Sequence, residues 1–132
     1  MSITNWNLVP AVSINGIEFG TEHSLVKKAL GKPKSVFRKT TNSGNTTDAY
    51  ADFHVYYSAD DRLEAIEFFG RNLCLCIDSR SVFPGTLSDA MKTIPDLVEC
   101  CGTYVSNPAS VGICAEDDNI VSILVGCRDY YR

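Results

Sequence analysis

The chain has 132 residues, of which 45% are hydrophobic and 21% are charged, and its net charge is −4 at neutral pH. A chain of this length buries roughly two-thirds of the surface that its unfolded form exposes, and the composition differs from that of disordered proteins. Nucleic acids and anionic membrane surfaces attract basic proteins, so an acidic chain is a poor match for either. We therefore predict one compact domain over residues 1–132, with neither nucleic acid nor a membrane as its partner.

The start of the chain bears on the location of the protein. The first ten residues contain neither the basic residues nor the apolar run of a secretory signal. No later stretch approaches the ~20 apolar residues that cross a bilayer as a helix. We expect the protein in the cytoplasm.

In chain order, residues 6–19 predict extended structure with one turn. A short helix follows, for which Thr21 is the predicted N-cap and Gly31, with its preference for a left-handed conformation, the predicted end. Pro33 blocks any continuation. The apolar side chains of this helix recur at helical spacing: Leu25, Val26, Ala29 and Leu30.

Extended segments are predicted after this helix. Residues 34–37 predict a short strand, and the polar segment 39–48 predicts a loop. Residues 50–57 and 63–69 are rich in aromatic and β-branched side chains and alternate in polarity, with turn residues at 58–62 between them. This pattern is typical of an antiparallel hairpin.

The second half of the chain repeats this order. Residues 73–77 predict a strand. Thr86 then begins a predicted helix, with Asp89 at the third position of a capping box, and Pro95 ends it. Residues 112–125 predict a second hairpin around a turn rich in acidic residues.

The chain therefore contains two predicted tandem repeats, at about 12–70 and 73–127, each with a strand, a helix and a hairpin. Such units cannot bury a helix face and a sheet face alone. We predict an α+β fold in which the two repeats form one antiparallel sheet with both helices packed on one face. The opposite face of the sheet then stays open for a partner.

Six cysteines lie in the second half of the chain: Cys74, Cys76, Cys100, Cys101, Cys114 and Cys127. Their C-x-C and C-C spacings differ from the C-x-x-C pattern of zinc sites, and no histidine lies near them in the sequence. We expect buried, reduced thiols, with no metal ion and no cofactor.

One segment resembles a known family. The pattern G-T-x-x-x-x-V-x-x-x-L-G-x-P is formed by Gly20, Thr21, Val26, Leu30, Gly31 and Pro33. With the hairpin at 53–69, it is similar to the repeat of the β-lactamase inhibitor protein family and of the small lipoprotein of the outer-membrane assembly machine. The match covers about half of the chain well and extends weakly over the rest. The resemblance implies a helix-flanked sheet whose exposed face grips another protein without catalysis. Neither secretion nor a lipid anchor carries over, and no contact residue is transferred.

Five residues form the candidate binding surface. Tyr50, Asp52, His54 and Tyr56 alternate along one predicted strand, and Glu64 lies on the next. Tyrosine is enriched among the residues that dominate binding energy, and neighbouring carboxylates favour a basic partner. We predict a protein–protein interaction module, with an inhibitor or immunity protein that binds a basic toxin or enzyme as its concrete form. We predict no catalytic residues and no metal ligands.

Two alternatives stay open. Asp52, His54 and Tyr56 can instead line a pocket for a small ligand or an enzyme substrate, because neighbouring side chains on one strand face are about 7 Å apart. His23, the only other histidine, falls in the first turn of a helix, where we expect it to be exposed. The second alternative is a homodimer formed through edge strands or open sheet faces.

Overall fold

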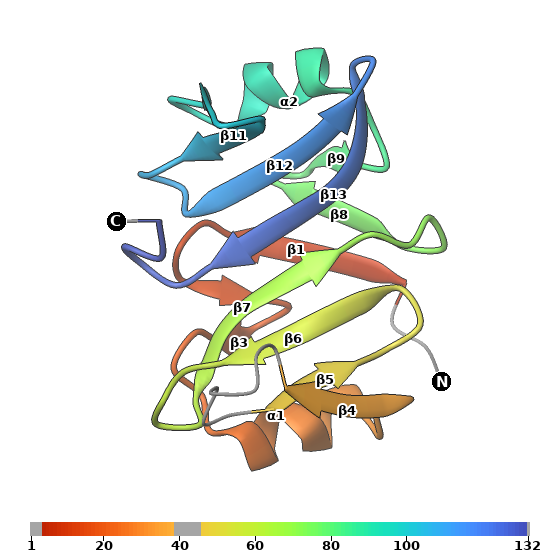
Figure 1. Ribbon diagram of the computed structural model, residues 1–132, viewed down its shortest axis with the longest axis vertical. Helices are drawn as coiled ribbons and strands as arrows, with labels where there is room; N and C mark the ends of the chain where they lie inside the picture. Colours follow the sequence, from red (N-terminus) through yellow and green to blue (C-terminus); the bar gives the residue numbers. More distant parts are fainter. Residues whose placement is uncertain (1–3, 39–45, 132) are drawn as a thin grey trace.

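The computed structural model describes residues 4–38 and 46–131, so most of the predicted loop, residues 39–45, lies outside the described residues. Two stacked β-sheets form the body of the protein, with one short helix at each end (Figure 1). Strands make up 49% of the structure and helices 12%. No helix in the described part of the chain is long and apolar enough to cross a membrane.

The larger sheet has eight strands, all paired antiparallel. From one edge to the other they are β10 (Val98–Cys100), β11 (Thr103–Ser106), β12 (Val111–Glu116), β13 (Asn119–Gly126), β7 (Leu63–Phe68), β6 (Phe53–Tyr57), β5 (Thr46–Ala49) and β4 (Ser35–Arg38). Each half of the chain supplies four consecutive strands, and the last strands of the two halves, β7 and β13, meet at the centre. Both halves therefore add their strands in the same order from the edge inward.

The smaller sheet was not expected from the sequence. Its strands are β3 (Ile17–Glu18), β2 (Ser13–Ile14), β1 (Asn5–Val9), β8 (Cys74–Ile77) and β9 (Arg80–Phe83). The two halves of the chain also meet in this sheet, where β1 and β8 pair in parallel with Trp6 opposite Leu75. The helices are α1 (His23–Leu30) and α2 (Leu87–Thr93).

The predicted α+β fold was wrong. The molecule is mostly β, and a second sheet takes the place against the large sheet that we had assigned to the helices. The reason lies in how little each helix can bury, since α1 buries one residue, Val26, and α2 buries two, Leu87 and Ala90. In contrast, the short apolar segments that precede the helices bury large side chains completely, Trp6 and Leu75 among them.

The helix ends follow the sequence in part. The predicted end of α1 at Gly31 is confirmed, and its φ of 89° is one that glycine adopts without strain. At the other end the N-cap is Glu22 rather than Thr21, because the Thr21 carbonyl accepts a hydrogen bond from the Leu63 N–H (2.8 Å) at the start of β7. Thr86 caps α2 through its side chain, as predicted.

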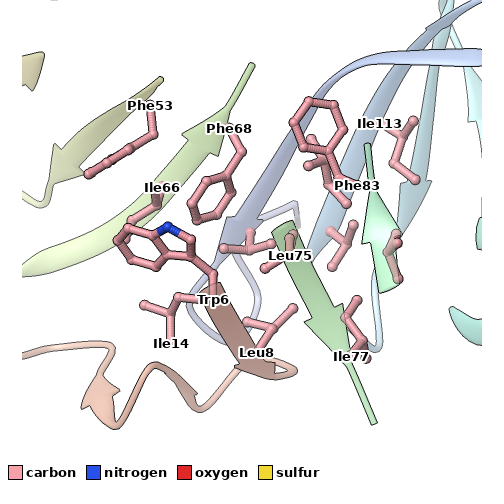
Figure 2. Close-up of a cluster of buried hydrophobic side chains, with 14 of the residues drawn as sticks. Trp6, Leu8, Ile14, Phe53, Ile66, Phe68, Leu75, Ile77, Phe83 and Ile113 are labelled. Carbon is pink, nitrogen blue, oxygen red and sulfur yellow. The ribbon is translucent and has the colours of Figure 1, made fainter. Parts of the chain in front are cut away.

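The core lies between the two sheets. In β1 every second residue is buried, which aims Trp6 at the large sheet. Its ring meets those of Phe53 and Phe68 edge to face, with centroids 4.9 and 5.1 Å apart (Figure 2). Edge-to-face pairs at this separation are favourable beyond the area they bury. Trp6 therefore joins β1 to the central strands of the opposite sheet.

We predict that Trp6→Ala lowers the free energy of unfolding by about 3–5 kcal/mol, because it leaves a cavity between the sheets. Urea denaturation followed by circular dichroism measures the change. Val9→Ala is the matched control on the same strand, because Val9 is 53% exposed and its truncation should stay within about 0.5 kcal/mol. Equal losses in the two variants would contradict this account of the core.

Candidate functional site

The outer face of the eight-stranded sheet, turned away from the small sheet, carries a cluster of aromatic and acidic side chains. On β6 the residues Phe53, Val55 and Tyr57 are buried, so His54 and Tyr56 point outward. The neighbouring strand places Glu67 directly opposite His54. Alternation along a strand thus selects which side chains reach this face.

The rings on this face pack around His54. Its ring centroid is 5.3 Å from that of Phe37, 4.8 Å from Phe69 and 6.4 Å from Tyr56, all in edge-on geometry. The Tyr56 hydroxyl donates a hydrogen bond to Glu67 Oε1 at 2.7 Å. We call these five residues the β6–β7 patch: Phe37, His54, Tyr56, Glu67 and Phe69.

The structure brings two of the five predicted binding residues into this patch, namely His54 and Tyr56. Tyr50 instead stacks on buried Phe53 with centroids 4.6 Å apart, and its hydroxyl donates to the Gly31 carbonyl at 2.7 Å. Asp52 lies in the turn between β5 and β6, where its carbonyl accepts hydrogen bonds from two backbone N–H groups. The alternation does not extend to these two positions because β6 begins at Phe53.

Glu64 occupies a bulge between β6 and β7. Tyr56 lies opposite Ala65 and Tyr57 opposite Leu63, so Glu64 is the extra residue. Its carbonyl accepts from the N–H of Cys127 at 2.8 Å. Burial first, and then the Glu64 carboxylate, raise the pKa of Cys127.

The sequence did not identify Glu67 as a site residue, because without the bulge its side chain is assigned to the wrong face. A bulge shifts every later residue of its strand relative to the partner. Phe37 and Phe69, at the margins of predicted strands, were also missed. The segments that contain these three residues are rich in apolar and aromatic residues. That composition does not show on which face of the sheet each side chain lies.

The end of the chain also lies on the outer face. Gly112 pairs with Leu124 and Gly126 with Ala65, which places both glycines on the same side of the sheet as the patch. The Tyr131 hydroxyl occupies the space that a Cβ on Gly112 would need, and the Tyr130 ring does the same at Gly126. Two glycines on adjacent strands thus seat the terminal tyrosines.

Burial keeps the phenols of this face protonated. It is the largest cause of the raised pKa of Tyr56, followed by the hydrogen bond to the Glu67 carboxylate. Burial likewise raises the pKa of Tyr130 and Tyr131. These side chains therefore act as neutral rings and hydrogen-bond donors near neutral pH.

A second polar cluster ties α1 to the large sheet. His23 Nε2 lies 2.7 Å from Asp48 Oδ2, and His23 Nδ1 lies 2.9 Å from Asp61 Oδ1. The imidazole stacks on Tyr57 at 3.6 Å, and the Tyr57 hydroxyl donates to Asp48 Oδ2 at 3.2 Å. His23, expected to be exposed, has a side chain only 17% exposed. Carboxylates thus engage both ring nitrogens, and the cluster joins α1 to β5 and to the turn that contains Asp61.

Two pockets lie away from these clusters. One, of about 180 Å³, is lined mainly by apolar residues that include Ile77 and Ile94, together with Asp78 and Thr93. The other, of about 620 Å³, lies beside β10 and is lined by Val98, Val105 and Tyr131 among others. Neither pocket includes a residue of the β6–β7 patch.

The six cysteines are free, but none is buried as we expected. Three are exposed and three are half-buried. No group of three or more His, Cys, Asp or Glu side chains within residues 4–38 and 46–131 is arranged to hold a metal ion.

The raised pKa values predict the alkaline behaviour of the protein. The pKa of Tyr50 is raised to about 12 by burial and then by Asp48, and those of Tyr56 and Tyr57 are also raised. Unfolded tyrosines ionise near pH 10, so the unfolded state releases protons there that the folded state retains. The free energy of unfolding should therefore fall as the pH rises above about 10.

Ultraviolet titration of tyrosinate, with and without urea, tests this prediction. At pH 11 the native protein should show much less tyrosinate absorbance than the unfolded chain, which carries the same six tyrosines. Two titration curves that coincide would mean that the phenols are not protected by the fold.

We also predict that His23→Ala destabilises the protein by about 3–5 kcal/mol, because it leaves the buried Asp48 carboxylate without its ionic partner. Asp48 is 0% exposed, and its Oδ1 has no hydrogen-bond partner among the described residues. Asp61→Ala is the control, since that carboxylate is 58% exposed and its loss should cost at most about 1 kcal/mol. If urea denaturation showed equal losses of stability in the two variants, the buried contact between His23 and Asp48 would not be the stabilising one.

The outer face thus combines the β6–β7 patch, the terminal tyrosines and the pocket beside β10, whereas the His23 cluster joins α1 to the large sheet. The chain matches no protein-family model, no curated protein and no solved structure. The case for a function therefore rests on the chemistry of the outer face.

Proposed function

We propose that this protein is a non-enzymatic binding module that captures a basic protein through the outer face of its eight-stranded sheet. The concrete form that we favour is an inhibitor or immunity protein that neutralises a toxin or an enzyme. The observation that carries the proposal is the β6–β7 patch, in which aromatic rings surround His54 and Glu67 lies directly opposite it.

The chemistry of the patch matches that of protein interfaces. Aromatic side chains are enriched at interfaces, and those that are already held in place lose little conformational entropy on binding. The hydrogen bond from Tyr56 to Glu67 holds both side chains in position before a partner arrives. A net charge of −4 adds long-range attraction for a basic protein and speeds its association.

The dimensions of the face also suit a protein partner. Eight strands spaced about 4.8 Å apart give a sheet roughly 34 Å across. A standard interface buries about 800 Å² on each side, which a surface of this width can supply. A cytoplasmic location belongs to the same proposal, because exposed thiols such as Cys100 and Cys114 stay reduced in that compartment.

A pocket around Asp52, His54 and Tyr56 has less support as the site of a ligand or a reaction. Asp52 lies in a turn, outside β6, and the two pockets described above are lined by other residues.

We predict that Tyr56→Ala weakens capture of the partner at least tenfold, since truncation of an interface tyrosine often costs more than about 1–2 kcal/mol. Glu67→Gln should weaken capture by less and should reduce its dependence on salt, because it removes the charge and keeps a hydrogen-bond acceptor. Quantitative pull-down from the native cell, with mass spectrometry of the captured proteins, measures both effects.

Glu18→Gln is the matched control, because it removes the same charge from β3 in the small sheet, where Glu18 is exposed. A genuine partner should be basic, and wild type and Glu18→Gln should capture it equally. Equal capture by the Tyr56→Ala variant, with unchanged thermal stability, would rule out the outer face as the binding surface. Elution of wild type alone as a dimer would favour self-association instead.

A further inference from the structure

A groove of about 620 Å³ opens on the outer face at its β10 edge, far from the β6–β7 patch along the order of strands. Its apolar floor follows from the sheet register. Val98 lies opposite Val105, and Val105 lies opposite Gly112, so these three positions form one row across β10, β11 and β12. Val98 is 63% exposed, an unusual placement for a large apolar side chain on a strand.

Tyr131 closes the groove on the side of the sheet centre. Its hydroxyl sits over Gly112, the last position of the same row, and its side chain lines the groove. The absence of a Cβ at Gly112 is what allows the ring to lie this close to the sheet. The groove thus has the aromatic ring of Tyr131 on one side and the aliphatic side chains of Val98 and Val105 at its base.

The charged side chain on this side of the groove is acidic. It belongs to Asp96, which precedes β10 and is exposed, whereas Glu99 follows Val98 and pairs with Tyr104, so its side chain points to the opposite side of the sheet. No lysine or arginine is among the described residues that line the groove. The groove therefore favours a cationic group attached to an apolar stem.

We propose that this groove receives an arginine side chain of the basic partner, an inference that rests on the proposed function. The guanidinium group stacks on the Tyr131 ring while its N–H donors reach the carboxylate of Asp96. The methylene stem of the arginine covers the valine floor. Arginine fits better than lysine because its planar, weakly hydrated group stacks on aromatic rings and donates to carboxylates in a fixed fork.

Three short peptides that differ at one central position test the proposal directly. The position is arginine, lysine or citrulline, and the flanking residues are glycine in all three. Titration followed by NMR of the methyl groups of Val98 and Val105 reports binding in the groove. We expect the arginine peptide to bind about threefold or more tightly than the lysine peptide, which corresponds to a cation–π difference of ~0.7 kcal/mol. The citrulline peptide should produce no saturable shift.

Two variants and one control locate the effect. Asp96→Asn should weaken binding of the arginine peptide about tenfold, whereas Asp117→Asn changes the same charge at another exposed site and should leave it unchanged. Gly112→Ala should displace the Tyr131 hydroxyl and reduce the preference for arginine over lysine.

Tyr131→Leu is a second test of the wall that does not alter the sheet, and it should reduce the same preference. Equal affinity for the arginine and lysine peptides in wild type would overturn the inference, as would saturable binding of citrulline. Loss of binding in the Asp117→Asn control would also overturn it, because the effect would then come from net charge.

Capture of the whole partner separates this inference from the proposed function. If Tyr56→Ala abolishes capture but the Asp96→Asn variant captures normally, the outer face binds the partner and the arginine site is wrong. If both variants lose capture, both proposals are supported. If neither loses capture, the outer face is not the interface and both proposals fail.

Discussion

The packing of the small sheet against the large one is the interaction on which the rest of the structure depends. Trp6 is fully buried and meets Phe53 and Phe68 across the interface between the sheets. Because Phe53 and every second residue after it on β6 face the core, the residues between them face outward. The position of His54 and Tyr56 is therefore a consequence of the core, and the candidate surface arises without any strained backbone in β6.

A second constraint acts through the register of the hairpin. The extra residue at Glu64 changes which side of β7 faces the solvent, so that Glu67 joins the aromatic cluster and Ala65 lies opposite Tyr56. Bulges are common where a strand must redirect a side chain toward a site. The single inserted position thus decides that a carboxylate lies next to the phenol of Tyr56.

Local signals in the sequence predicted local structure well. Gly31 ends α1, Thr86 caps α2, and alternating segments form the β6–β7 and β12–β13 hairpins. Signals of this kind depend on a few neighbouring residues. The predicted loop extended too far, because its last residues, 46–48, belong to β5.

The sheet arrangement and the site needed information that the local pattern lacks. Two-residue strands such as β2 and β3 leave almost no periodic signal, so the sequence predicted extended structure at 6–19 and a strand at 73–77 but no second sheet. The same alternation that correctly placed His54 and Tyr56 was carried too far, back to Tyr50 and Asp52, because nothing in the sequence marks the start of β6 at Phe53. The small sheet and the start of β6 both depend on contacts between segments that are far apart in the sequence.

The terminal tyrosines show how such distant contacts shape the candidate surface. A tail with the sequence Asp129-Tyr130-Tyr131 gives no sign of where it packs, and Gly112 and Gly126 look like ordinary breaks in strands. Together they form a matched set, because each ring occupies the volume left by a missing side chain. The tail thereby covers the middle of the outer face and leaves two separate openings, the β6–β7 patch on strands of the first half and the groove on strands of the second. A partner that spans both must cross the tyrosines, so the tail belongs to the surface that such a partner would contact.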